Sequence, residues 1–252
     1  MISFFTYNFQ DVKYFICSSC CNLVMAGSDK LMTKKLLQRS YELILKNTKV
    51  GTKCLVPELQ LHLLDKSCPW YHKTEVPELK YDPFWSVFWP GGQVLSRFVF
   101  DNKTVVKDKM VMDIGCGCGA LGIAAKKAGA TTVLCNDIDR VAMAAVQLNF
   151  QLNKLKPPIL SVEDILSSSC PIQGQNTAIF LGDMFYDEAM AKKIVAWCFR
   201  NSRTGNDIFI GDPGRWGLDF IRDHISKVAE YDIHDDDCGE YRAASVFRFI
   251  PD

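Results

Sequence analysis

Residues 111–123, VMDIGCGCGALGI, decide the fold of this chain. A short apolar run meets Asp113, four glycines follow within eight residues, and the helix-prone segment 124–130 comes next. This order predicts a strand, a tight turn and a helix. Glycines at this spacing permit positive φ angles and a close approach of backbone to a ligand, while the helix N-terminus supplies free N–H groups. We therefore expect a ligand-binding loop after a buried strand.

The glycine loop admits two interpretations. Its last three glycines spell GxGxxG, the dinucleotide fingerprint, which keeps an NAD-dependent oxidoreductase open. However, Asp113 stands two residues ahead of Gly115, and the resulting DxGxGxG resembles the S-adenosylmethionine loop of the seven-strand methyltransferases. In that family the acidic residue lies close to the methionyl part of the cofactor and the glycine backbone packs against it. The resemblance thus assigns Asp113, Gly115 and Gly117 to cofactor binding.

The length and net charge of the chain limit how many domains it can contain and which classes of partner it can attract. The chain has 252 residues, with 29 basic and 29 acidic side chains and a net charge of zero. This length predicts one α/β domain, residues 56–252, preceded by an extension, residues 1–55, with a targeting role or an accessory helix. A neutral chain has no global field to attract nucleic acid, so we expect no nucleic-acid partner.

The eleven cysteines are scattered and odd in number, and two of them lie in the glycine loop. Such a distribution favours reduced thiols and an intracellular compartment. Cys17, Cys20 and Cys21 form one CxxC, but no second CxxC or close histidine pair completes a zinc site, so no metal is expected.

The first 25 residues are apolar and aromatic, yet Asp11 and Lys13 interrupt them. No uncharged run reaches the ~20 residues that a membrane span needs, so we expect none. The stretch also lacks arginine before Arg39, which makes it a poor mitochondrial presequence.

The segments before the glycine loop predict a helix over 31–45 and a short strand or helix within 56–64. Five aromatic residues then lead into Trp89-Pro90-Gly91-Gly92, which predicts a turn followed by a helix over 93–100. Some of these rings must pack in the core. Because the cluster lies directly upstream of the cofactor loop, we expect Trp89 to face a ligand.

The strands after the loop end in acidic residues. Strand 131–139 carries Asp137 within the roughly twenty residues expected of a carboxylate that accepts two ribose hydroxyls. Asp139 is expected to cap the helix over 140–149. Strand 159–166 ends near Asp164, which could accept from the adenine amino group.

Two further strands, 177–181 and 208–210, run into GDMFYD and GDPGR, which place polar side chains at the ligand-binding edge of the sheet. A long helix over 218–231 and an antiparallel pair, 231–234 with 244–249, are predicted to complete a doubly wound α/β sheet.

Five motifs together resemble the seven-strand, Rossmann-like class I methyltransferases that act on protein lysines and carry a D-x-x-Y motif. They are WPGGQVLS (89–96), DIGCGCGALGIAA (113–125), NDID (136–139), GDMFYD (182–187) and GDPGR (211–215). The likeness extends from about Pro57 to the C-terminus, and it is strongest to the branch of the family that methylates the electron transfer flavoprotein β-subunit. It implies S-adenosylmethionine as cofactor, that subunit as protein substrate, and the mitochondrial matrix, or otherwise the cytoplasm, as location. It assigns Trp89, Asp137 and Asp164 to the cofactor, and Asp183 and Tyr186 to the target lysine.

Methyl transfer from a sulfonium is an in-line displacement that mainly requires positioned reactants. We expect Asp183 to orient the lysine nitrogen and Phe185 with Tyr186 to wall the alkyl stem. The competing interpretation makes Asp183 the cap of a helix beginning at Glu188. Other functions left open are a small-molecule N- or O-methyltransferase, the NAD-dependent oxidoreductase and a non-catalytic binding module.

Overall fold

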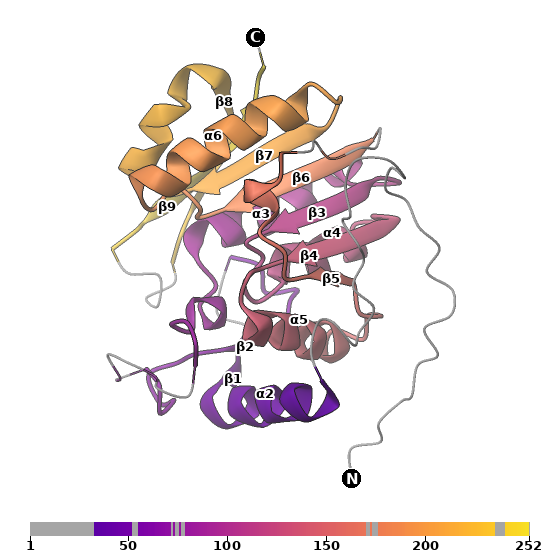
Figure 1. Cartoon of the computed structure of the whole chain (residues 1–252), viewed down its shortest axis with the longest axis vertical. Helices are drawn as coiled ribbons and strands as arrows, with labels where there is room; N and C mark the ends of the chain where they lie inside the picture. Colours follow the sequence, from indigo (N-terminus) through magenta and orange to yellow (C-terminus); the bar gives the residue numbers. More distant parts are fainter. Residues whose placement is uncertain are drawn as a thin grey trace.

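A seven-stranded mixed sheet forms the centre of the described part of the molecule (Figure 1). The computed structural model describes residues 33–51, 55–71, 73, 76, 79–169, 172, 176–234 and 240–251. The sheet order is β5-β4-β3-β6-β7-β9-β8, with the first five strands parallel and β9 antiparallel to both of its neighbours. The strands are β3 (Met110–Ile114), β4 (Thr132–Asn136), β5 (Ile159–Ser161), β6 (Thr177–Gly182), β7 (Asp207–Asp212), β8 (Ile225–Asp232) and β9 (Ala243–Phe249). This confirms the predicted fold class.

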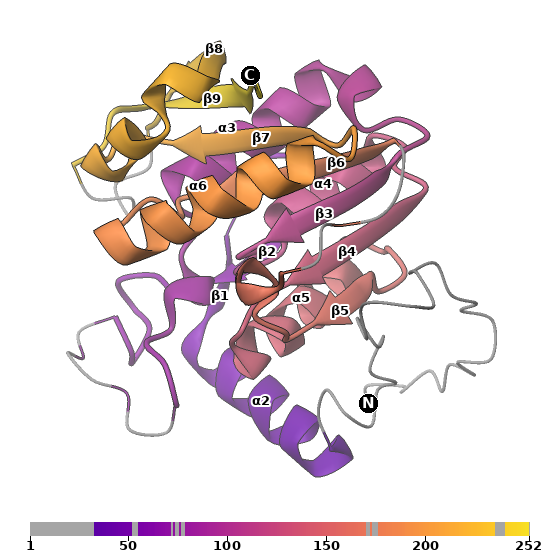
Figure 2. The same cartoon turned by 45° about the horizontal axis from the view of Figure 1, so that its top comes forward.

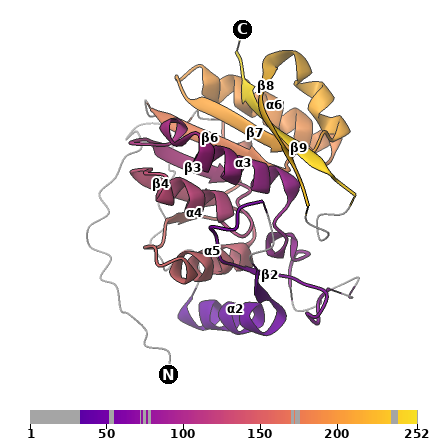
Figure 3. The ribbon, with the colours of Figure 1, turned by 180° about the vertical axis from the view of Figure 1, so that it is seen from behind.

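Helices cover both faces of the sheet. Three of them, α3 (Pro90–Asp101), α4 (Ala120–Lys127) and α5 (Arg140–Leu152), lie on one face, and α6 (Glu188–Ser202) lies on the other (Figure 1 and Figure 3). Side chains along each strand alternate between the two cores. In β6, Phe180 packs with the α3–α5 cluster, whereas its neighbour Ile179 packs with the α6 cluster. Because both faces are buried, the parallel strands read as continuous apolar runs, which is why the sequence shows them clearly.

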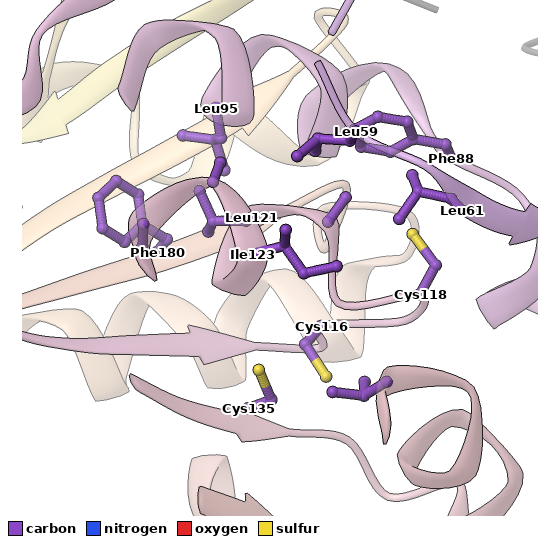
Figure 4. Close-up of a cluster of buried hydrophobic side chains, with 14 of the residues drawn as sticks. Leu59, Leu61, Phe88, Leu95, Cys116, Cys118, Leu121, Ile123, Cys135 and Phe180 are labelled. Atoms are coloured by element: carbon purple, nitrogen blue, oxygen red, sulfur yellow. The ribbon is translucent and has the colours of Figure 1, made fainter. Parts of the chain in front are cut away.

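Beneath the glycine loop, one apolar core contains side chains of the central sheet and side chains of segments that precede the sheet in the sequence. Figure 4 shows Ile123 of α4 and Phe180 of β6 close to Leu59 and Phe88 in one apolar cluster. The same core includes Leu61 of β2 (Leu61–Leu63), which pairs antiparallel with β1 (Lys49–Gly51).

The helix predicted near the N-terminus is α2 (Lys34–Asn47), and Thr33 caps it. It lies against α5, to which the Tyr41 hydroxyl donates a hydrogen bond at Gln147 (Figure 1 and Figure 2). None of the described helices is long and apolar enough to cross a membrane. The cysteines of the CxxC motif lie outside the described residues, and the domain boundary at residue 55 stays a prediction.

The Pro-Gly-Gly turn expected before residue 93 is the first turn of α3 itself. Pro90 occupies the first helical position, where its missing N–H costs nothing, and Trp89 is the N-cap residue. Gly91 faces β7 so closely that an added Cβ would lie 2.7 Å from the carbonyl carbon of Gly211. The glycines therefore let the N-terminus of α3 dock on the backbone at the carboxyl end of β7.

Gly91→Ala is expected to destabilise the protein by roughly 3 kcal/mol, because the backbone of β7 cannot move aside for the methyl group. The matched control is Gly92→Ala, whose Cβ would meet only the Phe88 ring at 3.4 Å. Thermal unfolding of the two purified variants compares them. Equal melting temperatures for both variants would contradict the close contact between α3 and β7.

The long helix predicted over 218–231 is wrong. This segment forms short 3-10 turns, Trp216–Phe220 and Arg222–His224, and then the edge strand β8. A register shift between Lys227 and Ala229 interrupts the alternation of β8. Around this bulge the apolar residues of the sequence stand at 225, 228 and 229. This spacing is typical of a helix, which explains the wrong prediction.

The third strand is shorter than the predicted 159–166. β5 ends at Ser161, and a 3-10 turn follows at Ile165–Ser167. The reason is local: the Asn136 side-chain amide donates to the carbonyl oxygens of Ser161 and Glu163, at 3.1 and 2.9 Å, and turns the chain away from the sheet.

Candidate active site

A cavity of about 1060 Å³ opens at the carboxyl ends of the parallel strands. Its walls come from the loops after β3, β4, β5, β6 and β7 and from segment 79–89. Open α/β sheets place ligands at this edge, and the volume slightly exceeds the upper end of the usual range for small-molecule sites. The cavity can therefore hold a nucleoside-sized ligand together with part of a second reactant.

The glycine loop forms the floor of the cavity. Gly115 and Gly117 line it with φ angles of 65° and 49°, a left-handed conformation that favours glycine. An added Cβ at Gly115 would collide with the Met184 side chain, with its Cε at 3.2 Å. The predicted strand, turn and helix are thus confirmed, and the loop presents backbone to the cavity.

Asp113 lies beneath the loop and does not line the cavity. It is 4% exposed, and its carboxylate accepts from the Gly122 N–H at 3.1 Å in the first turn of α4. Cys116 and Cys135 lie beside it, and Figure 4 shows the two cysteines near each other; the ligand atoms of all three residues lie within 4.8 Å of one another. The assignment of Asp113 to cofactor binding stays a prediction; in this structure its carboxylate fixes the shape of the loop from below.

Burial raises the pKa of Asp113 to about 7. A carboxyl group whose pKa is raised on folding costs stability above its folded pKa, and this cost disappears below its ordinary value of 3.8. Asp113→Asn retains an acceptor for the Gly122 N–H but carries no charge. We expect this variant to be more stable than wild type by up to about 4 kcal/mol near pH 8.

Denaturant unfolding of both proteins at several pH values checks this prediction. The difference should shrink as the pH falls and vanish near the ordinary carboxyl pKa of 3.8. A gap that stays constant with pH would contradict the buried-charge explanation.

Asp137 stands at the cavity wall just after β4. One carboxylate oxygen accepts from the Gly117 N–H at 3.1 Å and the other from the Asp139 N–H at 3.0 Å. Burial raises its pKa. The Ile138 backbone also interacts with this carboxylate. Because a carboxylate has about four acceptor positions, the group keeps capacity for hydroxyl donors from the cavity. Asp139 caps α5 at the Val141 N–H, 2.8 Å, as predicted.

Asp164 and Trp89 both line the cavity, at separate places. The Asp164 carboxylate accepts from Ser167 and forms an ion pair with Lys193 at 2.7 Å, which lowers its pKa. Much of its hydrogen-bonding capacity is therefore already used. The Trp89 indole N–H donates to the Phe84 carbonyl at 2.9 Å, and the two rings lie 6.3 Å apart.

Asp183 lies across the cavity from Asp137, after β6, on the other side of the central strand β3. Its φ angle is 59°, and its carboxylate accepts from Arg215 at 2.7 Å and from the Gly92 N–H at 2.9 Å. Burial raises its pKa to about 6, although Arg215 acts in the opposite direction. The helix-cap interpretation is wrong, because Asp187 caps α6 at the Met190 N–H.

The two aromatic residues after Asp183 have different places. Tyr186 lines the cavity and is 53% exposed, whereas Phe185 is fully buried in the α6 core. The expectation that Phe185 walls a lysine stem is therefore corrected. Met184 lines the cavity instead, because the left-handed turn at Asp183 directs residues 184 and 186 to the cavity and residue 185 to the core.

Several lining residues were not selected from the sequence as site residues. They include Tyr81, Phe84, Lys193, Arg215 and Tyr241. Among the described lining residues, six are acidic and three are basic. The acidic ones are Asp82, Asp137, Asp139, Glu163, Asp164 and Asp183, and the basic ones are Lys80, Lys193 and Arg215. An excess of carboxylates in a partly enclosed site attracts cationic ligands.

Comparisons with known proteins identify similar sequences. The model of the ribosomal protein L11 methyltransferase (PrmA) family matches residues 95–179, which include the glycine loop. The human electron transfer flavoprotein beta subunit lysine methyltransferase is 43% identical over 194 residues, covering 74% of this chain and 72% of that protein. The Xenopus laevis protein of the same name is 42% identical, covering 76% and 78%.

A more distant relative is the Caenorhabditis elegans homolog of the same methyltransferase. It is 35% identical over 199 residues, covering 74% of this chain and 82% of that protein. Among solved structures, the N-methyltransferase NodS from Bradyrhizobium japonicum, in complex with S-adenosyl-L-homocysteine, is 14% identical. It covers 64% of this chain and 88% of that chain, with a TM-score of 0.48.

Proposed function

Since the chain belongs to the electron transfer flavoprotein beta subunit lysine methyltransferase family, we propose that it methylates lysines of that subunit with S-adenosylmethionine. Family membership makes it a methyltransferase and decides against the oxidoreductase interpretation of GxGxxG. It also favours a protein lysine over a small-molecule acceptor. We propose the mitochondrial matrix as its location on the same basis.

One observation carries the proposal: two carboxylates, Asp137 and Asp183, line one cavity from opposite sides of β3. Methyl transfer needs two reactants in a single site, one bound through a ribose and one through an amine. A carboxylate suits each reactant. At one end of the cavity it can accept two ribose hydroxyl donors, and at the other end a second carboxylate can accept an amine N–H. The cavity has the size and the charge for both.

The residues on the cofactor side fit S-adenosylmethionine. The Asp137 carboxylate would accept the two ribose hydroxyls, and Asp164, which lines the same cavity, would accept from the adenine amino group. The side-chain-free loop at Gly115 and Gly117 leaves room for the methionyl part. When bound, the cofactor supplies a methyl group on a positively charged sulfonium, a charge that the acidic cavity favours.

The residues on the amine side position the nucleophile. A lysine has an ordinary pKa of about 10.4, and only its uncharged form has the lone pair that the reaction requires. We propose that the Asp183 carboxylate accepts an N–H of the uncharged amine and so directs the lone pair into the cavity. The Tyr186 ring, exposed at the rim, would contact the alkyl stem. The protein's contribution is then orientation and exclusion of water.

Mass spectrometry tests the proposal. Purified electron transfer flavoprotein is incubated with this protein and S-adenosylmethionine, and the intact mass of its β-subunit is measured. We expect increments of whole methyl groups that map to lysines. Parallel incubation with small-molecule amines is the control for acceptor class. An unmodified β-subunit together with a methylated small amine would contradict the proposal.

A further inference from the structure

Arg215 joins two buried carboxylates at the edge of the cavity. One of its terminal nitrogens donates to Asp183 at 2.7 Å and to Asp212 at 3.0 Å. The three side chains are 12%, 9% and 0% exposed. Asp212 in turn accepts from the backbone N–H groups of Gly214 and Arg215, at 2.9 and 2.7 Å. The arginine is thus fixed by its own loop and not only by Asp183.

Among the residues that the structure describes, Arg215 is the cation that faces the Asp183 carboxylate. From α3 comes only the backbone N–H of Gly92. From β7 and the loop after it come Asp212 and Arg215, of opposite charge. The loop between β8 and β9 contributes the Tyr241 ring, 5.2 Å from the guanidinium. The Lys193 ammonium, from α6, is paired with Asp164.

We propose that Arg215 is a positioning residue that fixes the Asp183 carboxylate and selects the uncharged form of the target amine. This inference rests on the proposed function. An unpaired Asp183 would form an ion pair with the lysine ammonium and would stabilise the form that has no lone pair. Arg215 already compensates the carboxylate, and its own charge repels an ammonium group beside it. The site is thus left to accept an N–H from the neutral amine.

The test compares Arg215→Met, which removes the charge, with Arg215→Lys, which retains it. Loss of the Arg215 charge raises the pKa of Asp183 and the pKa of the bound amine. Both effects move the rising limb of the pH profile of kcat to higher pH. We expect a displacement of about one pH unit and a roughly tenfold lower kcat near pH 7.5. The cofactor Kd and the KM for the protein substrate should change less than about threefold. Arg215→Lys should restore most of the pH profile.

Asp212→Asn is a second variant with the opposite expected sign. It removes the negative charge of Asp212, which raises the pKa of Asp183. Arg215 then pairs with the Asp183 carboxylate as its one charged partner in this group of three side chains. We therefore expect its rising limb to move to lower pH. Arg222→Met, which alters an exposed arginine paired with Asp219, is the matched control and should leave the pH profile unchanged.

A kcat that falls equally at every pH in Arg215→Met would overturn the inference, because a purely structural role predicts that result. Carboxyl NMR titration of Asp183 gives a readout that does not depend on activity. The pKa of Asp183 should rise in Arg215→Met, and an unchanged pKa would also overturn the inference. Wild-type protein that fails to methylate the β-subunit would instead contradict the proposed function.

Discussion

Asp183→Ala is expected to lower kcat for lysine methylation by roughly 10²–10³-fold while leaving the Kd for S-adenosylmethionine within about threefold. The carboxylate contacts the Gly92 N–H and Arg215 at one end of the cavity, away from Asp137. Its removal deprives the amine of its acceptor and leaves the Arg215 charge without one of its partners. Steady-state kinetics with the β-subunit measure kcat, and calorimetry measures the Kd.

The matched control is Asp183→Asn, which keeps the shape and one acceptor but not the charge. We expect intermediate activity from it, since Arg215 retains a hydrogen-bond acceptor. A large loss of cofactor affinity in Asp183→Ala would place this residue in the cofactor site. Full activity in that variant would remove it from the reaction altogether.

The second large effect is expected from Asp137→Ala, which should weaken S-adenosylmethionine binding by roughly 10²-fold or more. Two hydrogen bonds from ribose hydroxyls to a partly buried carboxylate would be lost. The loop would also lose the acceptor of the Gly117 N–H. Isothermal titration calorimetry measures the change directly.

Asp137→Asn should weaken cofactor binding less than alanine does, because its amide oxygen can still accept one hydroxyl. At saturating cofactor, kcat of both Asp137 variants should approach that of wild type. Unchanged cofactor affinity would remove the ribose role, and melting temperatures of the variants separate lost binding from lost folding.

The sequence alone predicts the sheet well. Each parallel strand is buried on both faces, so it appears in the sequence as a run of apolar residues. β6, predicted over 177–181, spans Thr177–Gly182, and β3 contains the apolar run that precedes Asp113. Where a side chain or a bulge redirects the backbone, local patterns mislead. Asn136 shortens β5, and the bulge in β8 imitates a helix. Both depend on partners that lie far away in the chain.

The site residues that directly follow a strand could be predicted from sequence motifs. The residues whose position depends on long-range contacts could not. Asp137 and Asp183 line the cavity as expected from their place after β4 and β6. Phe185 and Tyr186 are adjacent, and only the left-handed turn at Asp183 shows which of them faces the cavity. The Arg215 contact spans 32 residues and the Gly92 contact 91, so no local spacing reveals them.

A crystal structure of the complex with S-adenosylhomocysteine tests the central claim most directly, that one cavity binds a nucleoside cofactor at Asp137 and a lysine at Asp183. We predict that both ribose hydroxyls lie within hydrogen-bonding distance of the Asp137 carboxylate and that the sulfur faces the space between Asp183 and Tyr186. A nucleoside bound outside this cavity, or a sulfur directed away from Asp183, would contradict the account.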